Sequence, residues 1–143
     1  MRQAIHQLTV GTSGKGMTDL THDVVAWVRA EAIGTGLLTL WCKHTSASLT
    51  VQENADPTVR ADIERYFEAL APEDGRRYVH DDEGPDDMPA HLRTMLTHRA
   101  FHSRAGWAAG AGQVAGYLSV RTSAQAASPG DRAASVWRMT LRS

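Results

Sequence analysis

The chain has 143 residues, 42% of them hydrophobic, and a formal net charge of −1 at pH 7. This length suits one compact domain, and the balanced charge argues against nucleic acid or an anionic membrane as a partner. No apolar run approaches the roughly 20 residues that span a bilayer, and Cys42 is the single cysteine, which excludes an internal disulfide. We therefore expect a cytoplasmic protein, either an enzyme or a small-ligand binder.

Strand and helix patterns alternate along the first part of the chain. Residues 3–10 have strand character, and Thr21 is expected to cap the helix that follows. Four residues at helical spacing form the apolar face of that helix: Val24, Val25, Val28 and Ala32. Residues 37–42 and 46–52 have the pattern of two further strands, so three strands and one helix are expected before the next helix start.

Two more helices are predicted further along. Asp56 followed by Pro57 is a strong helix start, since proline has no N–H to lose at the first helical position. The inward face of this helix is expected to hold Val59, Ile63, Tyr66, Phe67 and Leu70. Asp87 is expected to cap a third, short helix. The residues of that helix expected to face inward are Met88, Leu92, Met95 and Leu96.

The composition changes near residue 101. Residues 101–143 hold five arginines and a single acidic residue, Asp131, and they are rich in alanine and glycine. Only residues 115–120 and 135–141 suggest strands there. The composition alone is typical of a flexible tail.

Polar residues gather at two points near the expected strands. His44, Thr45 and Ser46 follow a strand, and their imidazole and hydroxyl groups suit a phosphate or a metal-bound ligand. The alternative is a capped strand end whose hydroxyls bond nearby backbone. Glu53 and Asn54 stand just before a helix start, and helix capping does not account for them.

The densest group of candidate ligands runs from His80 to His91. The sequence HDDEGPDDMPAH contains two histidines and five carboxylates: Asp81, Asp82, Glu83, Asp86 and Asp87. Carboxylate oxygens suit Mg²⁺, and added imidazole nitrogens suit Zn²⁺ or Mn²⁺. A cation here would neutralise charge that develops on pyrophosphate. The alternative is a solvated acidic loop with a helix cap, and no single spacing decides between the two.

Two motifs in a fixed order resemble those of the YjbQ family, also called the secondary thiamine-phosphate synthase family. HTSASLTVQENADP, residues 44–57, is similar to the family pattern HTTASLTINENADP. HDDEGPDDMPAHL, residues 80–92, is similar to H-DEG-DDMPAHL. The likeness covers residues 3–100, and Ser46 stands where a threonine is usual, which keeps the hydroxyl.

The resemblance implies an α+β fold with a β-sandwich-like sheet core and about three helices, assembled as a homotrimer. It also implies a weak thiamine-phosphate synthase activity, which joins a pyrimidine pyrophosphate to a thiazole phosphate and releases pyrophosphate. The catalytic residues it implies are His44, Thr45, Glu53, Asn54 and Glu83. It implies a divalent metal, magnesium or zinc, held by His44, His80 and His91. The alternative is a non-catalytic protein that binds a metal or a small phosphorylated metabolite with the same residues.

Residues 101–143 do not match the family, which continues with a segment like IPV-DG-L-LG-WQGI-LFEHR-PHRREV. The family's closing strands are therefore expected to be missing or replaced. Read one nucleotide later, the codons of residues 113–118 permit Arg or Lys, Trp, Gln, Gly and Ile. Those of residues 120–131 permit Phe-Glu-His-Arg-Arg-Lys-Pro-His-Arg-Arg-Glu, and Met139 followed by Thr140 must give a stop codon.

These agreements lead to the hypothesis that the tail is the family's C-terminal segment translated out of frame. The chain then divides into an incomplete domain, residues 1–100, and a frameshifted tail, residues 101–143. The rival interpretation is a tail that diverged naturally. If the shift is real, the product is expected to be marginally stable and at best poorly active, because alanine and glycine bury little side-chain surface.

Overall fold

Two antiparallel sheets and three α-helices make up the part of the chain that the computed structural model describes, which is residues 2–11, 15–43, 47–52, 56–98, 100–106, 117–122 and 134–142. The strands are β1 (Gln3–Gly11), β2 (Gly16–Asp19), β3 (Thr35–Cys42), β4 (Ser48–Gln52), β5 (Ala100–Gly106), β6 (Tyr117–Thr122) and β7 (Ala134–Arg142). The helices are α1 (Thr21–Ala30), α2 (Pro57–Leu70) and α3 (Asp87–Met95), with a short 3-10 turn, η1 (Gly75–Arg77). The α+β fold class is confirmed.

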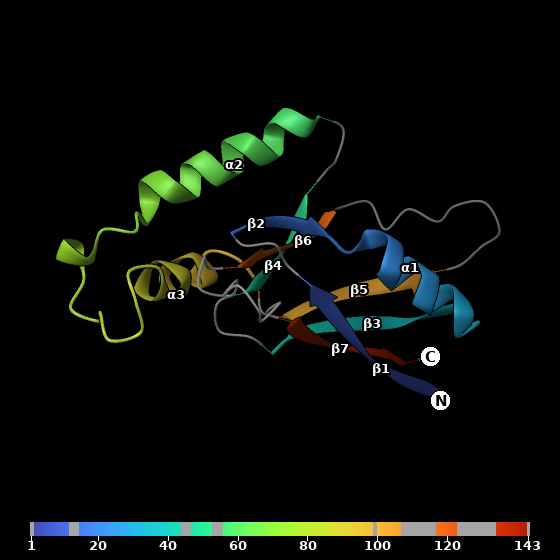
Figure 1. Cartoon of the computed structure of the whole chain (residues 1–143). Helices are drawn as coiled ribbons and strands as arrows, with labels where there is room; N and C mark the ends of the chain where they lie inside the picture. The colour runs from blue at the N-terminus through green and yellow to red at the C-terminus, as the bar shows by residue number, and fades with distance from the viewer. Residues whose placement is uncertain are drawn as a thin grey trace.

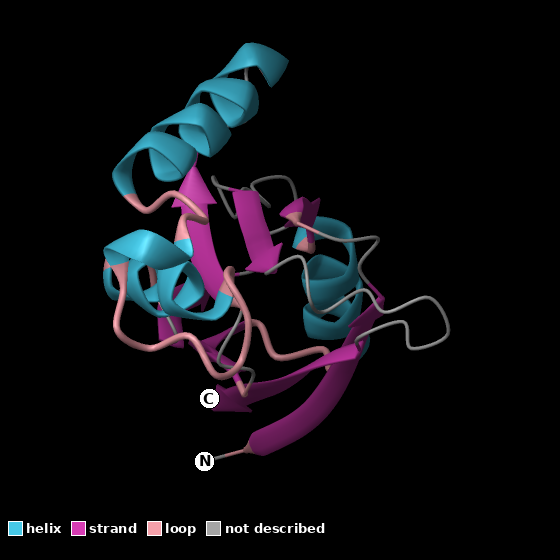
Figure 2. Ribbon diagram, turned by 60° about the vertical axis from the view of Figure 1, so that its left-hand side comes forward, coloured by secondary structure: helices cyan, strands magenta, loops and turns pink. Residues whose placement is uncertain are grey.

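The larger sheet has the order β1-β7-β3-β5 and the smaller one β2-β6-β4. β7 pairs with both β1 and β3, and β6 pairs with both β2 and β4. The two termini lie beside each other, away from α2 (Figure 1). In Figure 2, α2 and α3 lie toward the left of the molecule and α1 toward the right.

The C-terminal segment supplies three strands. The strands expected at residues 115–120 and 135–141 are confirmed as β6 and β7, whereas β5 was not expected. The family's closing strands were expected to be either missing or replaced. They are not missing, since β6 and β7 occupy inner positions in the two sheets.

The core lies between the inner faces of the sheets and α1. β3 alternates as a strand with one buried face does: Leu38 and Leu40 are buried, whereas Leu37 and Trp41 are about half exposed. The residues that form the core cluster are Val10, Leu20, Val24, Val28, Ile33, Leu38, Leu40, Cys42, Ala47 and Leu49. Each fully buried leucine stabilises the fold by about 1.5–3 kcal/mol relative to an exposed one.

The start of α1 differs from the prediction. Thr21 is the first residue of the helix rather than its cap, and its backbone N–H donates to the Asp19 carboxylate at 2.8 Å. Val24 and Val28 are buried as expected. Ala32 is exposed, beyond the helix end, and has a left-handed backbone with a φ of 51°.

The start of α2 agrees with the prediction, but its face does not. Asp56 caps the helix by accepting from the backbone N–H and the hydroxyl of Thr58, both at 2.8 Å. Val59, Tyr66 and Leu70 are exposed, because α2 projects from the sheets (Figure 1). Amphipathic spacing thus identified the helix correctly and overstated how much of it is covered.

α3 also buries a different face from the one expected. Met95 and Leu96 are exposed at its C-terminal end, and Met88 and Leu92 are only partly buried. The residues that α3 buries are Asp87, Pro89, Ala90 and Arg93. The physical reason is that charged side chains of α3 find partners inside, as described below.

Candidate functional site

Three ligand-type side chains converge at the start of α3. Nε2 of His80 lies 3.1 Å from Oδ2 of Asp87, and Nε2 of His91 lies 3.2 Å from the same oxygen. One ligand atom from each residue lies within 4.8 Å of the others. The imidazole rings are edge to face, with centroids 6.1 Å apart. The two nitrogens therefore approach one carboxylate oxygen from different directions.

Local structure accounts for this convergence. Asp87 and His91 are four residues apart on α3, so their side chains share a helix face. His80 is brought back by successive turns: the N–H of Gly84 donates to the carbonyl of Asp81 at 3.2 Å, and that of Asp87 to the carbonyl of Gly84 at 3.3 Å. Gly84 has a φ of 107°, a conformation that side chains other than glycine's rarely allow.

The burial of the three groups suits ligand binding. The Asp87 side chain is 9% exposed, whereas those of His80 and His91 are 44% and 49% exposed. The carboxylate is thus enclosed by protein, whereas the imidazoles remain partly open to solvent. An incoming ion or ligand can reach the group without a change of fold.

The donor set fits a divalent transition metal. Two imidazoles and one carboxylate suit zinc better than magnesium, which prefers oxygen ligands alone. With metal–ligand bonds of about 2.0–2.1 Å, tetrahedral ligands lie roughly 3.3 Å apart. The two N···O distances of 3.1 and 3.2 Å are already close to that value.

Each predicted site residue has a definite place or lies outside the described part of the chain. His80 and His91, both expected as metal ligands, lie together. Glu83 is exposed and does not belong to the group. His44, Thr45, Glu53 and Asn54 lie outside the described residues.

Sequence reasoning counted Asp87 among five candidate carboxylates but singled it out only as a helix cap. The N-cap of α3 is Asp86, whose side chain makes no capping bond, and Asp87 is the first helical residue. The expectation that Asp87 caps the helix is therefore wrong. The available signal was its spacing of four residues from His91.

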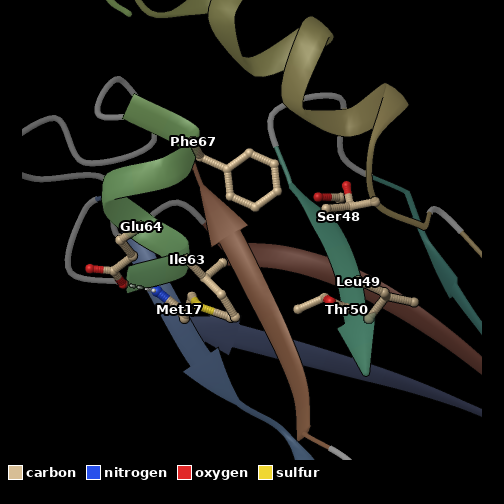
Figure 3. Close-up of a pocket in the computed structure, with 8 residues that line it drawn as sticks. Met17, Ser48, Leu49, Thr50, Ile63, Glu64 and Phe67 are labelled. Carbon is tan, nitrogen blue, oxygen red and sulfur yellow. Dashed lines mark hydrogen bonds between the residues drawn. The ribbon is translucent and has the colours of Figure 1, made fainter. Parts of the chain in front are cut away.

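An apolar cavity lies apart from this group, beneath α2 (Figure 3). It is lined by Met17 of β2, residues 48–50 of β4, Ile63, Glu64 and Phe67 of α2, and Thr97. The cavity holds about 10 Å³, which is room for a single water molecule. It is too small for a phosphorylated metabolite. A larger, open hollow of about 460 Å³ is lined by Lys15, Gly16, Ala61, Glu64, Arg65 and Glu68, and among the described residues it contains no group of metal-ligand type side chains like that of His80, Asp87 and His91.

The profile of the family described as UPF0047 protein YjbQ-like matches residues 6–102. The chain belongs to this family. The match ends near residue 102, close to the change in composition at residue 101. Within the described residues, no helix is both long and apolar enough to cross a membrane.

Relatives from bacteria match over a similar length of chain. The UPF0047 protein sll1880 of Synechocystis is 48% identical over 101 residues, which cover 71% of this chain and 69% of the relative. The UPF0047 protein YjbQ of Escherichia coli O157:H7 is 42% identical over 90 residues, 62% of this chain and 64% of the relative. Sequence similarity thus spans about two thirds of each protein.

The fold similarity extends further than the sequence similarity. A YjbQ/UPF0047 family protein from Clostridium acetobutylicum has a TM-score of 0.73 at 20% identity, covering 97% of this chain and 99% of that one. A YbjQ-like protein of unknown function from Sulfolobus solfataricus has a TM-score of 0.80 at 14% identity, covering 98% and 96%. At these identities the likeness establishes the fold, and no function follows from it.

Proposed function

We propose that this protein binds a divalent metal ion at His80, Asp87 and His91 and uses it to hold a small phosphorylated metabolite. The observation that carries the proposal is the approach of both imidazole nitrogens to one buried carboxylate oxygen, at 3.1 and 3.2 Å. An acidic loop without a ligand role would spread its charges into solvent, whereas here Asp87 is enclosed. A cytoplasmic location accords with the single, buried cysteine.

The proposed reaction is a weak thiamine-phosphate synthase activity. It joins a pyrimidine pyrophosphate to a thiazole phosphate and releases pyrophosphate. A bound cation would neutralise charge on the departing pyrophosphate. We assign charge stabilisation to His44 and proton handling to Glu53 or Glu83, with Thr45 and Asn54 holding phosphate oxygens.

Zinc binding to the purified chain tests the metal site. Isothermal titration calorimetry of the wild type is expected to show one zinc ion per chain. His80→Ala and His91→Ala each remove a ligand and are expected to weaken binding at least tenfold. His22→Ala is the matched control, since the His22 side chain is 96% exposed and remote in sequence from the group. Equal affinity in all four proteins would exclude the proposed site.

Turnover is tested separately from binding. Incubation with the two thiamine precursors and zinc or magnesium is expected to yield thiamine phosphate slowly, and His80→Ala to yield less. Zinc binding without any product above background would leave the alternative, a non-catalytic metal and phosphometabolite binder. The end of the family match near residue 102 favours keeping that alternative, because the tail then lacks the family's closing residues.

A further inference from the structure

A buried arginine joins the segments that carry the candidate ligands. Arg93 lies in the last turn of α3, and only 4% of its side chain is exposed. Its Nη2 donates to the carbonyl oxygen of Ala71 at 2.5 Å and lies 3.2 Å from Oε2 of Glu68. Its Nη1 lies 3.4 Å from Oε1 of Glu73. One guanidinium therefore contacts the end of α2 and the start of the connection to α3.

A second cation completes this network. Nζ of Lys15, just before β2, lies 3.2 Å from Oε2 of Glu68 and 2.7 Å from Oε1 of Glu73. Two cations and two carboxylates thus balance in charge, which is the condition under which a charged group is tolerated inside a protein. Nε of Arg93 is buried and has no hydrogen-bond partner among the described residues. The guanidinium is therefore held by its two outer nitrogens.

The position of α3 depends unusually on these polar contacts. Its large apolar residue Met95 is 80% exposed, and the neighbouring Leu96 is 57% exposed. The uncharged residues that α3 buries, Pro89 and Ala90, offer little apolar surface. Hydrophobic packing alone therefore fixes α3 less firmly than it fixes α1.

The same contacts control the path of the chain to His80. Residues 71–86 contain only the three-residue turn η1 between α2 and α3. Arg93 holds the beginning of this connection through Ala71 and Glu73, and α3 itself forms its end. The guanidinium thereby closes the loop in which His80 returns to Asp87.

We infer that Arg93 is a positioning residue for the His80, Asp87 and His91 site. It contacts none of the three ligands and acts by holding α3 and the loop at the separation that lets His80 reach Asp87. The inference rests on the proposed metal-binding function. Groups that hydrogen-bond metal ligands directly are worth about 10–100-fold in metal affinity, and a residue one step further out is expected to reach the lower end of that range. A lysine, with a single compact charge, cannot reproduce three contacts of a planar guanidinium.

Zinc titration of matched variants tests this role. Arg93→Lys is expected to bind zinc about tenfold more weakly than wild type. Glu73→Gln, a milder change that leaves α3 intact, is expected to weaken binding less. Val28→Ala is the control: it opens a cavity in the α1 core, lowers stability, and is expected to leave zinc affinity unchanged. Weakening by Val28→Ala equal to that by Arg93→Lys would overturn the inference, since the effect would then be general loss of stability.

A metal-free measurement separates this inference from the proposed function. In NMR spectra of the protein without metal, Arg93→Lys and Glu73→Gln are expected to move the ring signals of His80 and His91, as is Asp87→Asn, which removes their common contact. Val28→Ala is expected to leave those signals in place. Unmoved ring signals in both network variants would overturn the positioning role. Absence of zinc binding by the wild type would instead overturn the proposed function, and the ring signals would still decide the role of Arg93.

Discussion

At the scale of single residues, the Asp87 carboxylate governs the candidate site. Its side chain is only 9% exposed, and two imidazole nitrogens lie at hydrogen-bond distance from it. Burying a carboxylate costs free energy unless hydrogen-bond or ionic partners surround it. This placement gives a metal ligand that is already oriented, so binding does not have to order it.

Asp87→Asn is expected to weaken zinc binding at least tenfold, since the amide keeps the shape of the side chain but loses the anionic ligand. Asp82→Asn removes the same charge from an exposed position in the same loop and is expected to have no comparable effect. Calorimetric titration of both variants distinguishes coordination by Asp87 from attraction by the acidic loop as a whole. Equal weakening by the two substitutions would show that only overall charge matters.

The sequence identified His80 and His91 as candidate ligands but did not reveal their contact with Asp87. The HDDEGPDDMPAH segment made His80 and His91 visible because ligand-type residues are dense there. The partnership with Asp87 depends on which aspartate begins α3 and on the turn at Gly84, and both are set by the folded chain. Two adjacent aspartates offer no local signal that separates the cap position from the first helical residue.

At the scale of elements, local signals predicted the strands and helices that carry their own pattern. The Asp56-Pro57 start of α2 and the alternating β3 are examples. β2 was missed because four residues give too short a pattern and because its pairing partner, β6, lies about a hundred residues away in sequence. The exposed face of α2 was equally beyond sequence reasoning, since spacing identifies an apolar face and does not identify what covers it.

The cap of α2 makes stability depend on pH. Hydrogen bonds from the Thr58 backbone and hydroxyl lower the pKa of Asp56 below its ordinary value of 3.8. Because the folded pKa is the lower one, the cap stabilises the protein above pH 3.8 and is lost as pH falls through the folded value. Asp56→Asn keeps an oxygen acceptor that does not titrate. The thermal midpoint of wild type minus that of Asp56→Asn is therefore expected to decrease as the pH is lowered from 5 to 3. A difference that stays constant over this range would contradict this expectation.

At the scale of the whole molecule, one inner strand of each sheet comes from the segment that the family profile does not match. β6 and β7 pair on both sides, yet sequence similarity ends near residue 102. We propose that residues 101–143 are the family's C-terminal segment read out of frame. The extent of the fold similarity, 97% of the chain, accords with a domain whose architecture needs those strands.

The coding sequence tests this proposal directly. In the shifted frame, Val114 followed by Ala115 gives tryptophan only if the valine codon is GTG. Sequencing of the gene is expected to show that codon and an unbroken shifted frame. Any other valine codon at that position would contradict the proposal and favour natural divergence.

Restoring the frame is expected to raise stability. Residues 101–143 as a whole are rich in alanine and glycine, which bury little side-chain surface, so the present chain should melt at a lower temperature than the restored one and tend to aggregate. The restored chain is expected to sediment as a homotrimer, in which a partner would cover exposed apolar residues of α2 such as Tyr66 and Leu70. A cooperative melt and a well-defined trimer for the present chain would contradict this expectation.

The measurement that tests the central claim most directly is X-ray diffraction at the zinc absorption edge from crystals of the zinc-loaded protein. The account predicts an anomalous peak bonded to Nε2 of His80, a carboxylate oxygen of Asp87 and Nε2 of His91, at about 2.0–2.2 Å from each. A zinc peak elsewhere with these three side chains still in mutual hydrogen-bond contact, or no peak at all, would contradict it.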